Sequence, residues 1–417
     1  MTDTAQCPFN GPQSLPGDST PLRPSPTIAA WREAGAAVPL RYSDDHVGFV
    51  VTRYDAARGV LEDRRFSQQP QRTPQGPIHG HPSPDEGTGN WHVEDDDKVP
   101  GKATLDAAAR HASEVSNLLG LDGASHARMR RAITSRFSVR QVRSRQEWVA
   151  TTVARQLEHL RAQGSPAELT AHYAQPISAL THCHVLGVPD SRVPTFINRF
   201  VHTSTTQEKY DFIRDVLDAR RGDPGEDVIS DLLGSDFSIA EIEGLLHVLM
   251  TSGRDSVAYM IATATVALLS HPRQLAALRS EPHLIDGAIE EFMRTGAMFI
   301  TLFPRTATED VEIEGISIRA GQTVSVSPVG ANRDPRRFDH PDDFDIERDA
   351  SGHLGFGHGP HGCVGQQLAR LEIREAITQL ISGLPAIKLV EAEQTRPMPF
   401  ANPVATYEAG SVVIAWD

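Results

Sequence analysis

Cys363 lies in the segment of most unusual composition, residues 356–365, which have the sequence FGHGPHGCVG. The four glycines of this segment permit tight turns and close approach of the backbone. Directly after the cysteine, Leu368, Leu371 and Ile377 fall on one face of an expected amphipathic helix. A thiol at the start of a helix meets unpaired N–H groups and the positive end of the helix dipole, which lower its pKa. A lone cysteine is by default a small buried residue, but these surroundings favour a thiolate that binds a metal.

The same segment matches the haem-binding loop of the cytochrome P450 family, Phe-Gly-x-Gly-x-His-x-Cys-x-Gly, at every specified position. The chain resembles the soluble bacterial members of this family from about residue 28 to its end. The resemblance implies that the cofactor is haem b (iron protoporphyrin IX), that Cys363 is its axial ligand, and that His361 contacts a propionate. It also places Phe356 and Gly365 in the cofactor loop. A thiolate ligand pushes electron density onto haem iron and favours cleavage of the O–O bond.

Three further basic residues match family positions that bind haem propionates. Arg305 matches the arginine that binds one propionate, and His126 and Arg130 match a helix that reaches the other. Cations at i and i+4 project from one helical face and can grip carboxylates. Without the cysteine loop, the four basic residues from Arg128 to Arg136 would as readily form a solvated surface face. Arg128 and Arg131, on the same helix, could instead face an acidic redox partner.

Glu291 and Arg294 match the Glu-x-x-Arg motif of the family. Residues at i and i+3 share a helical face, so the two side chains can meet. The motif alone is weak because helices contain many such pairs. The resemblance implies a structural salt-bridge network that holds the core beneath the haem loop. Asp343 occupies the place of the third partner, which is left unassigned.

A long central helix is expected over the cofactor. Ser238 and Glu241 form a capping box, apolar residues continue to Leu269, and Pro272 marks the exit. These limits predict one helix of about 30 residues, or about 45 Å.

The middle of this expected helix contains residues that a buried helix tolerates poorly. A glycine costs about 1 kcal/mol there, and such local violations indicate a functional site. Gly253 and Asp255 fit the family pattern Ala/Gly-Gly-x-Asp/Glu-Thr, but Ser256 replaces the usual threonine. The resemblance implies that Asp255 and Ser256 are catalytic and relay protons. Serine lacks the methyl group that restrains the side chain of threonine. Proton delivery is therefore expected to be less tightly coupled to product formation. In the alternative, Asp255 merely pairs with Arg254.

The resemblance places three segments around the substrate pocket: residues 77–104, 298–302 and 400–404. Their apolar character suits an organic substrate with few polar groups. Each residue is as readily a packing residue as a binding one. The segment between Gly187 and Arg221 is short for the two lid helices of the family, which predicts a compact lid. The predicted pocket residues are Trp91, Met298, Phe299, Ile300, Thr301, Phe400 and Ala401.

The pattern along the chain predicts a mainly α protein with small β-sheets. Residues 1–27 are expected to form an extended arm, and residues 28–417 a single cytochrome P450-like domain. A hairpin is expected around the turn at Asp44–Asp45, then a helix from Tyr54 to Leu61 and a long loop over 70–104. Helical spacing dominates from Ala107 to about residue 285, short β-like runs follow residue 298, and a last helix covers about 364–380. In the implied fold, haem lies between the long central helix and the helix after the cysteine.

Composition limits the partners of the chain. Its 417 residues carry 40 Lys+Arg and 54 Asp+Glu, a net charge of −14, which disfavours nucleic acid and anionic membranes. We find no apolar stretch of about 20 residues that would span a bilayer and no secretory signal. Three cysteines cannot form a disulfide framework, so a reducing cytoplasm is the expected location.

The sequence predicts a haem-thiolate monooxygenase that activates O₂ and acts on a small organic substrate, in specialised metabolism by family analogy. Electrons are expected from a ferredoxin and a ferredoxin reductase, and indirectly from NAD(P)H. Two alternatives stay open. One is an enzyme that uses peroxide or nitrogen oxides, which the unusual Arg254 keeps in view. The other is a non-catalytic haem sensor, against which Asp255 and Ser256 argue.

Overall fold

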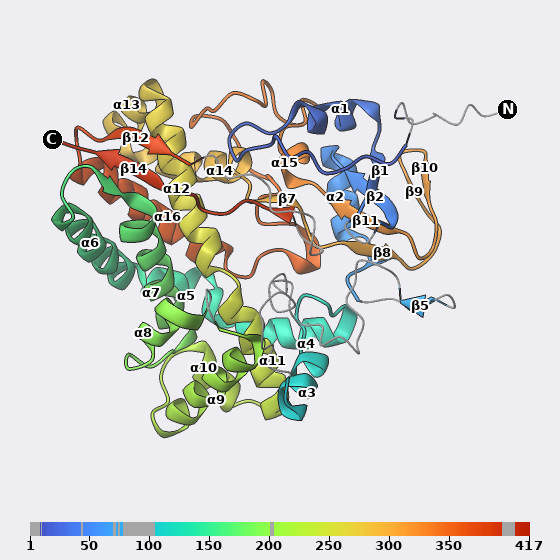
Figure 1. Cartoon of the computed structure of the whole chain (residues 1–417), viewed down its shortest axis with the longest axis horizontal. Helices are drawn as coiled ribbons and strands as arrows, with labels where there is room; N and C mark the ends of the chain where they lie inside the picture. Colours follow the sequence, from blue (N-terminus) through green and yellow to red (C-terminus); the bar gives the residue numbers. More distant parts are fainter. Residues whose placement is uncertain are drawn as a thin grey trace. The chain divides into compact units, whose positions relative to one another are not determined.

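The chain is mainly helical with small sheets, as predicted (Figure 1). The computed structural model describes residues 9, 11–42, 45–69, 72–73, 76–77, 105–200, 204–393 and 405–417. Contacts within the chain divide it into two units. Unit 1 comprises residues 1–82, 263–363 and 392–410, and unit 2 comprises residues 83–262, 364–391 and 411–417.

Unit 1 contains a five-stranded sheet of order β1-β2-β11-β8-β3. The predicted hairpin is confirmed: β1 (Ala37–Arg41) runs antiparallel to β2 (Val47–Val51), with Val38 opposite Val50. The strand β11 (Thr323–Val326) lies parallel to β2 and antiparallel to β8 (Arg305–Ala307), which pairs with β3 (Phe66–Ser67). The other elements of unit 1 are α1 (Pro26–Ala34), α2 (Tyr54–Glu62), β4 (Arg72–Thr73), β5 (Gly76–Pro77), α13 (Pro272–Ser280), η5 (Pro282–Leu284), α14 (Ile285–Thr295), β7 (Phe299–Thr301), β9 (Val311–Ile313), β10 (Ile316–Ile318), α15 (Pro328–Ala331), η6 (Gly359–His361) and β13 (Ala405–Thr406).

The helix α2 covers this sheet and fixes one core of unit 1. Its buried residues Tyr54, Ala57, Val60 and Leu61 pack in one cluster with sheet residues such as Val324. Apolar residues at this spacing form one helical stripe, which explains why the helix was predictable from sequence. Burial of these side chains holds α2 against the sheet, and the cysteine loop packs against α2.

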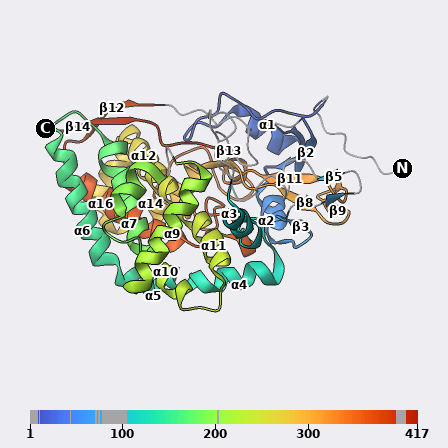
Figure 2. The ribbon, with the colours of Figure 1, turned by 60° about the horizontal axis from the view of Figure 1, so that its bottom comes forward.

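Unit 2 is built from helices. Three of them pack against one another: α6 (Gln146–Ala162), α7 (Gln175–Leu186) and α16 (Gln366–Gly383) (Figure 2). The predicted helix after the cysteine is therefore present, with its start shifted by two residues and its end by three. The remaining elements are α3 (Ala107–Val115), α4 (Gly123–Thr134), η2 (Ser135–Phe137), α5 (Val139–Ser144), η3 (Thr170–Ala174), α8 (Val193–Thr195), η4 (Phe196–Phe200), α9 (Thr206–Gly222), α10 (Val228–Leu233), α11 (Ile239–Thr251), and a sheet of β12 (Lys388–Ala392), β14 (Val412–Ala415) and β6 (Ala167–Glu168).

The prediction of one uninterrupted central helix is wrong. The capping box of Ser238 and Glu241 is present, but α11 ends at Thr251 and a second helix, α12 (Arg254–Ser270), starts after Gly253. Gly253 has a φ of +86°, a left-handed conformation that favours glycine and ends the first helix. The apolar periodicity continues on both sides of the break, which is why sequence reasoning joined the two helices.

The segment predicted as a compact lid is short. Its described part consists of the helical turns of α8 and η4 and the single long helix α9. Phe196, Phe200 and Phe212 pack against one another there, with ring centroids 5.1 to 6.2 Å apart, and the rings of Phe196 and Phe200 are stacked. Among the helices that the structure describes, none is both long and apolar enough to cross a membrane.

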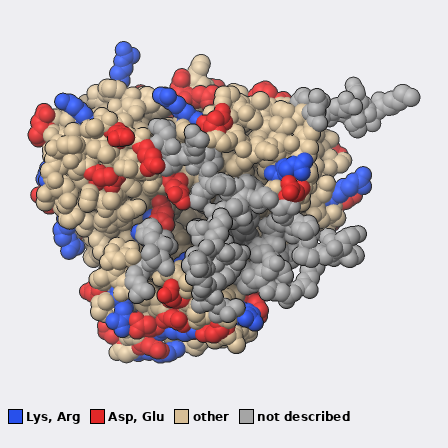
Figure 3. Space-filling model, viewed as in Figure 1, with Lys and Arg blue, Asp and Glu red and all other residues tan. Residues whose placement is uncertain are grey.

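Charged side chains of both signs are interspersed on the face that Figure 3 shows. Arg214 of α9 illustrates their pairing: its Nη1 lies 2.8 Å from Asp106 Oδ2, and its Nε lies 3.2 Å from Glu243 Oε1. The hydrogen bond from Arg214 lowers the pKa of Asp106 to about 2. Because Asp106 also caps α3 and Glu243 belongs to α11, Arg214 links three helices of unit 2.

The carboxyl group of Glu372, on α16, is buried beside Thr181 of α7. Among the described residues, its Oε2 has no hydrogen-bond partner. Burial raises the pKa of Glu372 well above its ordinary value of 4.5, so the folded protein retains a proton that the unfolded chain releases.

We therefore expect the contribution of Glu372 to wild-type stability to fall as pH rises above about 4.5, by up to about 1.4 kcal/mol per pH unit, until its folded pKa is passed. A Glu372→Gln variant has no proton to lose, so its advantage in melting temperature should grow between pH 5 and pH 8. The matched control is Glu375→Gln on the same helix, where the side chain is partly exposed. An advantage of Glu372→Gln that stayed constant with pH would contradict the assignment.

Candidate active site

The cysteine loop is closed by its own backbone. The N–H of Cys363 donates to the carbonyl of Phe356 at 2.8 Å, and the N–H of Gly362 donates to that of Gly359 at 3.0 Å. Gly359 has a φ of +69°, and a Cβ atom at this position would lie 2.6 Å from the carbonyl oxygen of Leu61 in α2. Only glycine therefore lets the loop rest on α2. The result is a fixed turn on which Cys363 is exposed.

A polar contact that the sequence did not reveal also ties this loop to α2. The ring Nε2 of His358 bonds to Glu62 Oε1, and Arg58 Nε lies 3.2 Å from the same ring nitrogen. The hydrogen bond from His358 holds the pKa of Glu62 below its usual value. His358 stands at an unspecified position of the loop motif, so nothing in the motif pointed to this contact.

The predicted propionate-binding residues are divided between the two units. In unit 1, Arg305 on β8 is buried and donates from Nη1 to the carbonyl of Phe66 at 3.3 Å, and His361 is half-buried. In unit 2, His126 is buried on α4 and Arg130 is half-buried one turn later. The residues of unit 1 by themselves fit haem: the exposed thiol of Cys363 offers a single axial ligand, and the guanidinium of Arg305 can neutralise a carboxylate. The individual contacts to the cofactor stay predictions.

Arg128 has an ion-pair partner inside unit 2, and its role toward a redox partner stays a prediction. Its Nη1 lies 2.5 Å from Glu241 Oε1, and its guanidinium lies 3.8 Å from the centre of the Phe237 ring. Arg131 on the same helix is exposed, and its role toward a partner stays a prediction.

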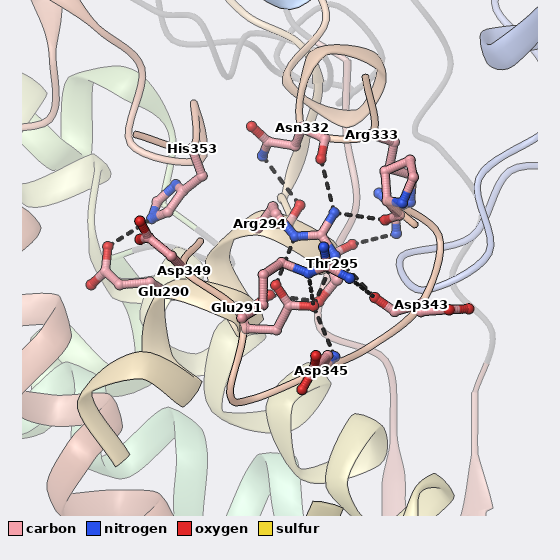
Figure 4. Close-up of polar contacts among 12 residues, drawn as sticks. Glu290, Glu291, Arg294, Thr295, Asn332, Arg333, Asp343, Asp345, Asp349 and His353 are labelled. Atoms are coloured by element: carbon pink, nitrogen blue, oxygen red, sulfur yellow. Dashed lines mark hydrogen bonds and ion pairs between the residues drawn. The ribbon is translucent and has the colours of Figure 1, made fainter. Parts of the chain in front are cut away.

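Glu291 and Arg294 form a fully buried ion pair in unit 1 (Figure 4). Arg294 donates from Nε to Glu291 Oε2 at 2.7 Å and from Nη2 to Oε1 at 2.8 Å. This two-bond geometry is the strong form of an arginine–carboxylate contact. The remaining donors of Arg294 bind the backbone carbonyls of Asn332, Pro341 and Asp343 at 2.6 to 3.0 Å.

The third partner left open by the sequence is Arg348, not the carboxylate of Asp343. Asp343 contributes only its backbone oxygen, whereas Arg348 Nε lies 3.6 Å from Glu291 Oε1. The N–H of Asp345 also donates to Glu291 Oε1, at 3.0 Å. A basic residue soon after the Asp-rich segment was the available signal, but spacing alone could not show which cation returns to Glu291.

This network reaches the start of the cysteine loop. The side chain of Asn332 donates to the carbonyl of Arg294 at 3.1 Å and accepts from the N–H of Leu354 at 2.7 Å. Beside it, His353 bonds to Glu290 at 3.0 Å (Figure 4). The contacts therefore lead from Glu291 to residue 354, two positions before Phe356.

At the break in the central helix, the two predicted relay residues have local partners. Asp255 Oδ1 lies 3.2 Å from Nη1 of the buried Arg254, the pairing that the sequence left as the alternative. Ser256 donates its hydroxyl to the carbonyl of Gly253 at 3.2 Å. Asp255 remains 46% exposed, so its carboxylate can still exchange protons with solvent. Its relay role stays a prediction.

The predicted substrate residues are only partly described. Met298 and Phe299 are half-buried, whereas Ile300 and Thr301 are buried in β7, which pairs with β13. Trp91, Phe400 and Ala401 lie outside the residues that the structure describes. Lining of the pocket therefore stays a prediction for all seven residues.

Comparison with known proteins identifies the family. The family model for cytochrome P450 matches residues 178–398. The chain is 32% identical over 410 residues to cytochrome P450 105C1 of a Streptomyces species, covering 94% of this chain and 95% of the relative. It is 33% identical over 383 residues to the cytochrome P450 monooxygenase PikC of Streptomyces venezuelae, covering 88% and 85%. Among solved structures, the cytochrome P450 hydroxylase LnmA of the leinamycin biosynthetic pathway of Streptomyces atroolivaceus matches with a TM-score of 0.76 and 29% identity, covering 98% of this chain and 99% of that one. The chain is therefore a member of the cytochrome P450 family, an oxidoreductase whose cofactor is haem b.

Proposed function

We propose that this monooxygenase takes its electrons from a ferredoxin and a ferredoxin reductase, and hydroxylates, epoxidises or oxidatively couples a small organic substrate in specialised metabolism. The observation that carries the proposal is the closed loop that presents Cys363 on an exposed turn. Two relatives support its finer parts: PikC is a monooxygenase, and LnmA is a hydroxylase of a biosynthetic pathway.

Haem b, when bound, supplies the activation of O₂. Cys363 would provide the sulfur ligand, Arg305 would provide positive charge for a propionate, and the ring of His361 would provide a hydrogen-bond donor to it. The hydroxyl of Ser256 can hold and pass a proton, and the half-exposed carboxylate of Asp255 can resupply it from solvent. The Glu291–Arg294 pair holds the segment from which the cysteine loop starts.

A second candidate, use of peroxide or nitrogen oxides without a redox partner, is favoured by the ion pair between Arg254 and Asp255. This ion pair engages one carboxylate oxygen of Asp255, which is then less free to take part in a proton relay. An enzyme that receives a preformed peroxide depends less on proton delivery, so such a pairing would cost it less.

The two candidates are separated by the electron source. Small molecules that shift the haem spectrum would first be selected, and then incubated with ferredoxin, reductase and NADPH, or with hydrogen peroxide alone. We expect product with the ferredoxin system, and lower yield of product per NADPH in Ser256→Ala than in wild type or Ser256→Thr. Product with peroxide alone, and none with the ferredoxin system, would contradict the proposal and support the second candidate.

A further inference from the structure

The break between α11 and α12 is bridged from outside by one helix, α7. His182 Nε2 lies 2.9 Å from the carbonyl oxygen of Leu249, in the last turn of α11. Ser178 donates its hydroxyl to the carbonyl of Arg254, the first residue of α12, at 2.5 Å. Ser178 and His182 are four residues apart and so share one face of α7. Their two bonds therefore fall on opposite sides of the break.

His182 donates to the carbonyl of Leu249 near the end of α11. The two preceding carbonyls accept instead from groups of α11 itself and of its C-cap. The carbonyl of His247 accepts from the hydroxyl of Thr251 at 2.7 Å, and that of Val248 accepts from the N–H of Ser252 at 3.1 Å. The last carbonyls of a helix need partners other than helical N–H groups. For Leu249, a side chain fixed in a neighbouring helix takes this role.

The ring of His182 is held in a defined state. A carbonyl oxygen can only accept, so Nε2 carries the hydrogen. The ring lies 6.0 Å from that of Phe196 at an interplanar angle of 26°, and a Cβ atom on Gly253 would lie 3.3 Å from its Cε1. Burial lowers the pKa of His182 to about 4, against smaller raising effects of the hydrogen bond to Leu249 and of Asp255, so the ring is neutral near pH 7.

We propose that His182 and Ser178 are positioning residues of the oxygenase reaction, which hold the break open and thereby set the location of Ser256 and Asp255. The link runs through the backbone: Ser178 holds the carbonyl of Arg254, next in the chain to Gly253, whose own carbonyl accepts the hydrogen bond from Ser256. Without the two bonds from α7, the break is free to close or shift, and the serine hydroxyl moves with it. This inference rests on the proposed relay by Asp255 and Ser256.

The first test measures the break without any substrate. Hydrogen–deuterium exchange would be followed in the peptide covering residues 249–257 of the haem-loaded protein. We expect His182→Phe, which keeps an aromatic ring but removes the donor, to exchange roughly 3- to 10-fold faster there, the range implied by loss of one such hydrogen bond. His182→Gln restores an N–H donor and should exchange like the wild type. Exchange in His182→Phe at the wild-type rate would overturn the proposal.

Two further variants keep this test informative. His184→Phe is the matched control, because His184 is exposed on the same helix and stacks on Trp148 instead; we expect no change in residues 249–257. Ser178→Ala removes the second bond by a small substitution and should speed exchange in the same peptide. It replaces His182→Phe as the deciding variant if that protein does not fold, and wild-type exchange in Ser178→Ala would then overturn the proposal.

The second test asks whether the break affects the coupling of NADPH consumption to product formation. Hydrogen peroxide released per NADPH, with a substrate found by the spectral screen, should rise in His182→Phe and not in His182→Gln or His184→Phe. Faster exchange with unchanged coupling in His182→Phe would overturn the positioning role alone. Unchanged coupling in Ser256→Ala would instead overturn the relay of the proposed function.

Discussion

A Cys363→Ala variant is expected to lose the red-shifted band that reduced, carbon monoxide-bound haem shows when a thiolate is its axial ligand. The methyl group of alanine cannot ligate iron, and the neighbouring loop offers no second sulfur. Oxygenase activity with the ferredoxin system should fall to background, since the thiolate promotes O–O cleavage. The absorption spectrum of the purified, haem-loaded protein gives the result directly.

Cys183→Ala is the matched control for this experiment. Cys183 is buried on α7, and burial raises the pKa of its thiol to about 12, so it stays protonated and unavailable as a ligand. We expect the thiolate band to persist in this variant. A well-folded, haem-loaded wild type without the band, or its loss in Cys183→Ala, would mean that the axial ligand is not Cys363.

The parts of this molecule that the sequence predicted well depend on neighbours in the chain. The hairpin of β1 and β2 follows from apolar runs around a turn, and α2 follows from an apolar stripe. The loop around Cys363 was recognisable because its turns require glycine at fixed positions. In each case the information lies within about ten residues of the feature.

The parts that the sequence did not predict depend on distant residues. A glycine inside a helix costs only about 1 kcal/mol relative to alanine. The apolar pattern around Gly253 therefore predicted one long helix. The break at Gly253 is accompanied by donors on α7, more than 60 positions earlier in the chain, which no periodicity reveals. Likewise, several cations lie in or just after the Asp-rich segment that precedes the cysteine loop, and only the fold shows that Arg348 approaches Glu291.

The ion pair of Glu291 and Arg294 leads to the second large expected effect. Both side chains are fully buried, and Arg294 also donates to the backbone carbonyls of Asn332 and Pro341. Removing one charge of a buried pair leaves the other uncompensated, which costs about 3–5 kcal/mol. Such a loss is a large share of the stability of an ordinary domain, about 5–15 kcal/mol. We therefore expect Glu291→Gln to yield little haem-loaded protein, with a clearly lower melting temperature.

Glu290→Gln is the control that separates this explanation from a general sensitivity of α14. Glu290 is adjacent on the same helix and bonds to His353, but its side chain is 23% exposed, so solvent can compensate for a lost charge. Haem content per polypeptide and thermal melting should change far more in Glu291→Gln than in Glu290→Gln. Because the bonds from Arg294 continue through Asn332 to the N–H of Leu354, haem content should fall together with stability. Equal losses in the two variants would show that the helix, not the buried pair, supports the cysteine loop.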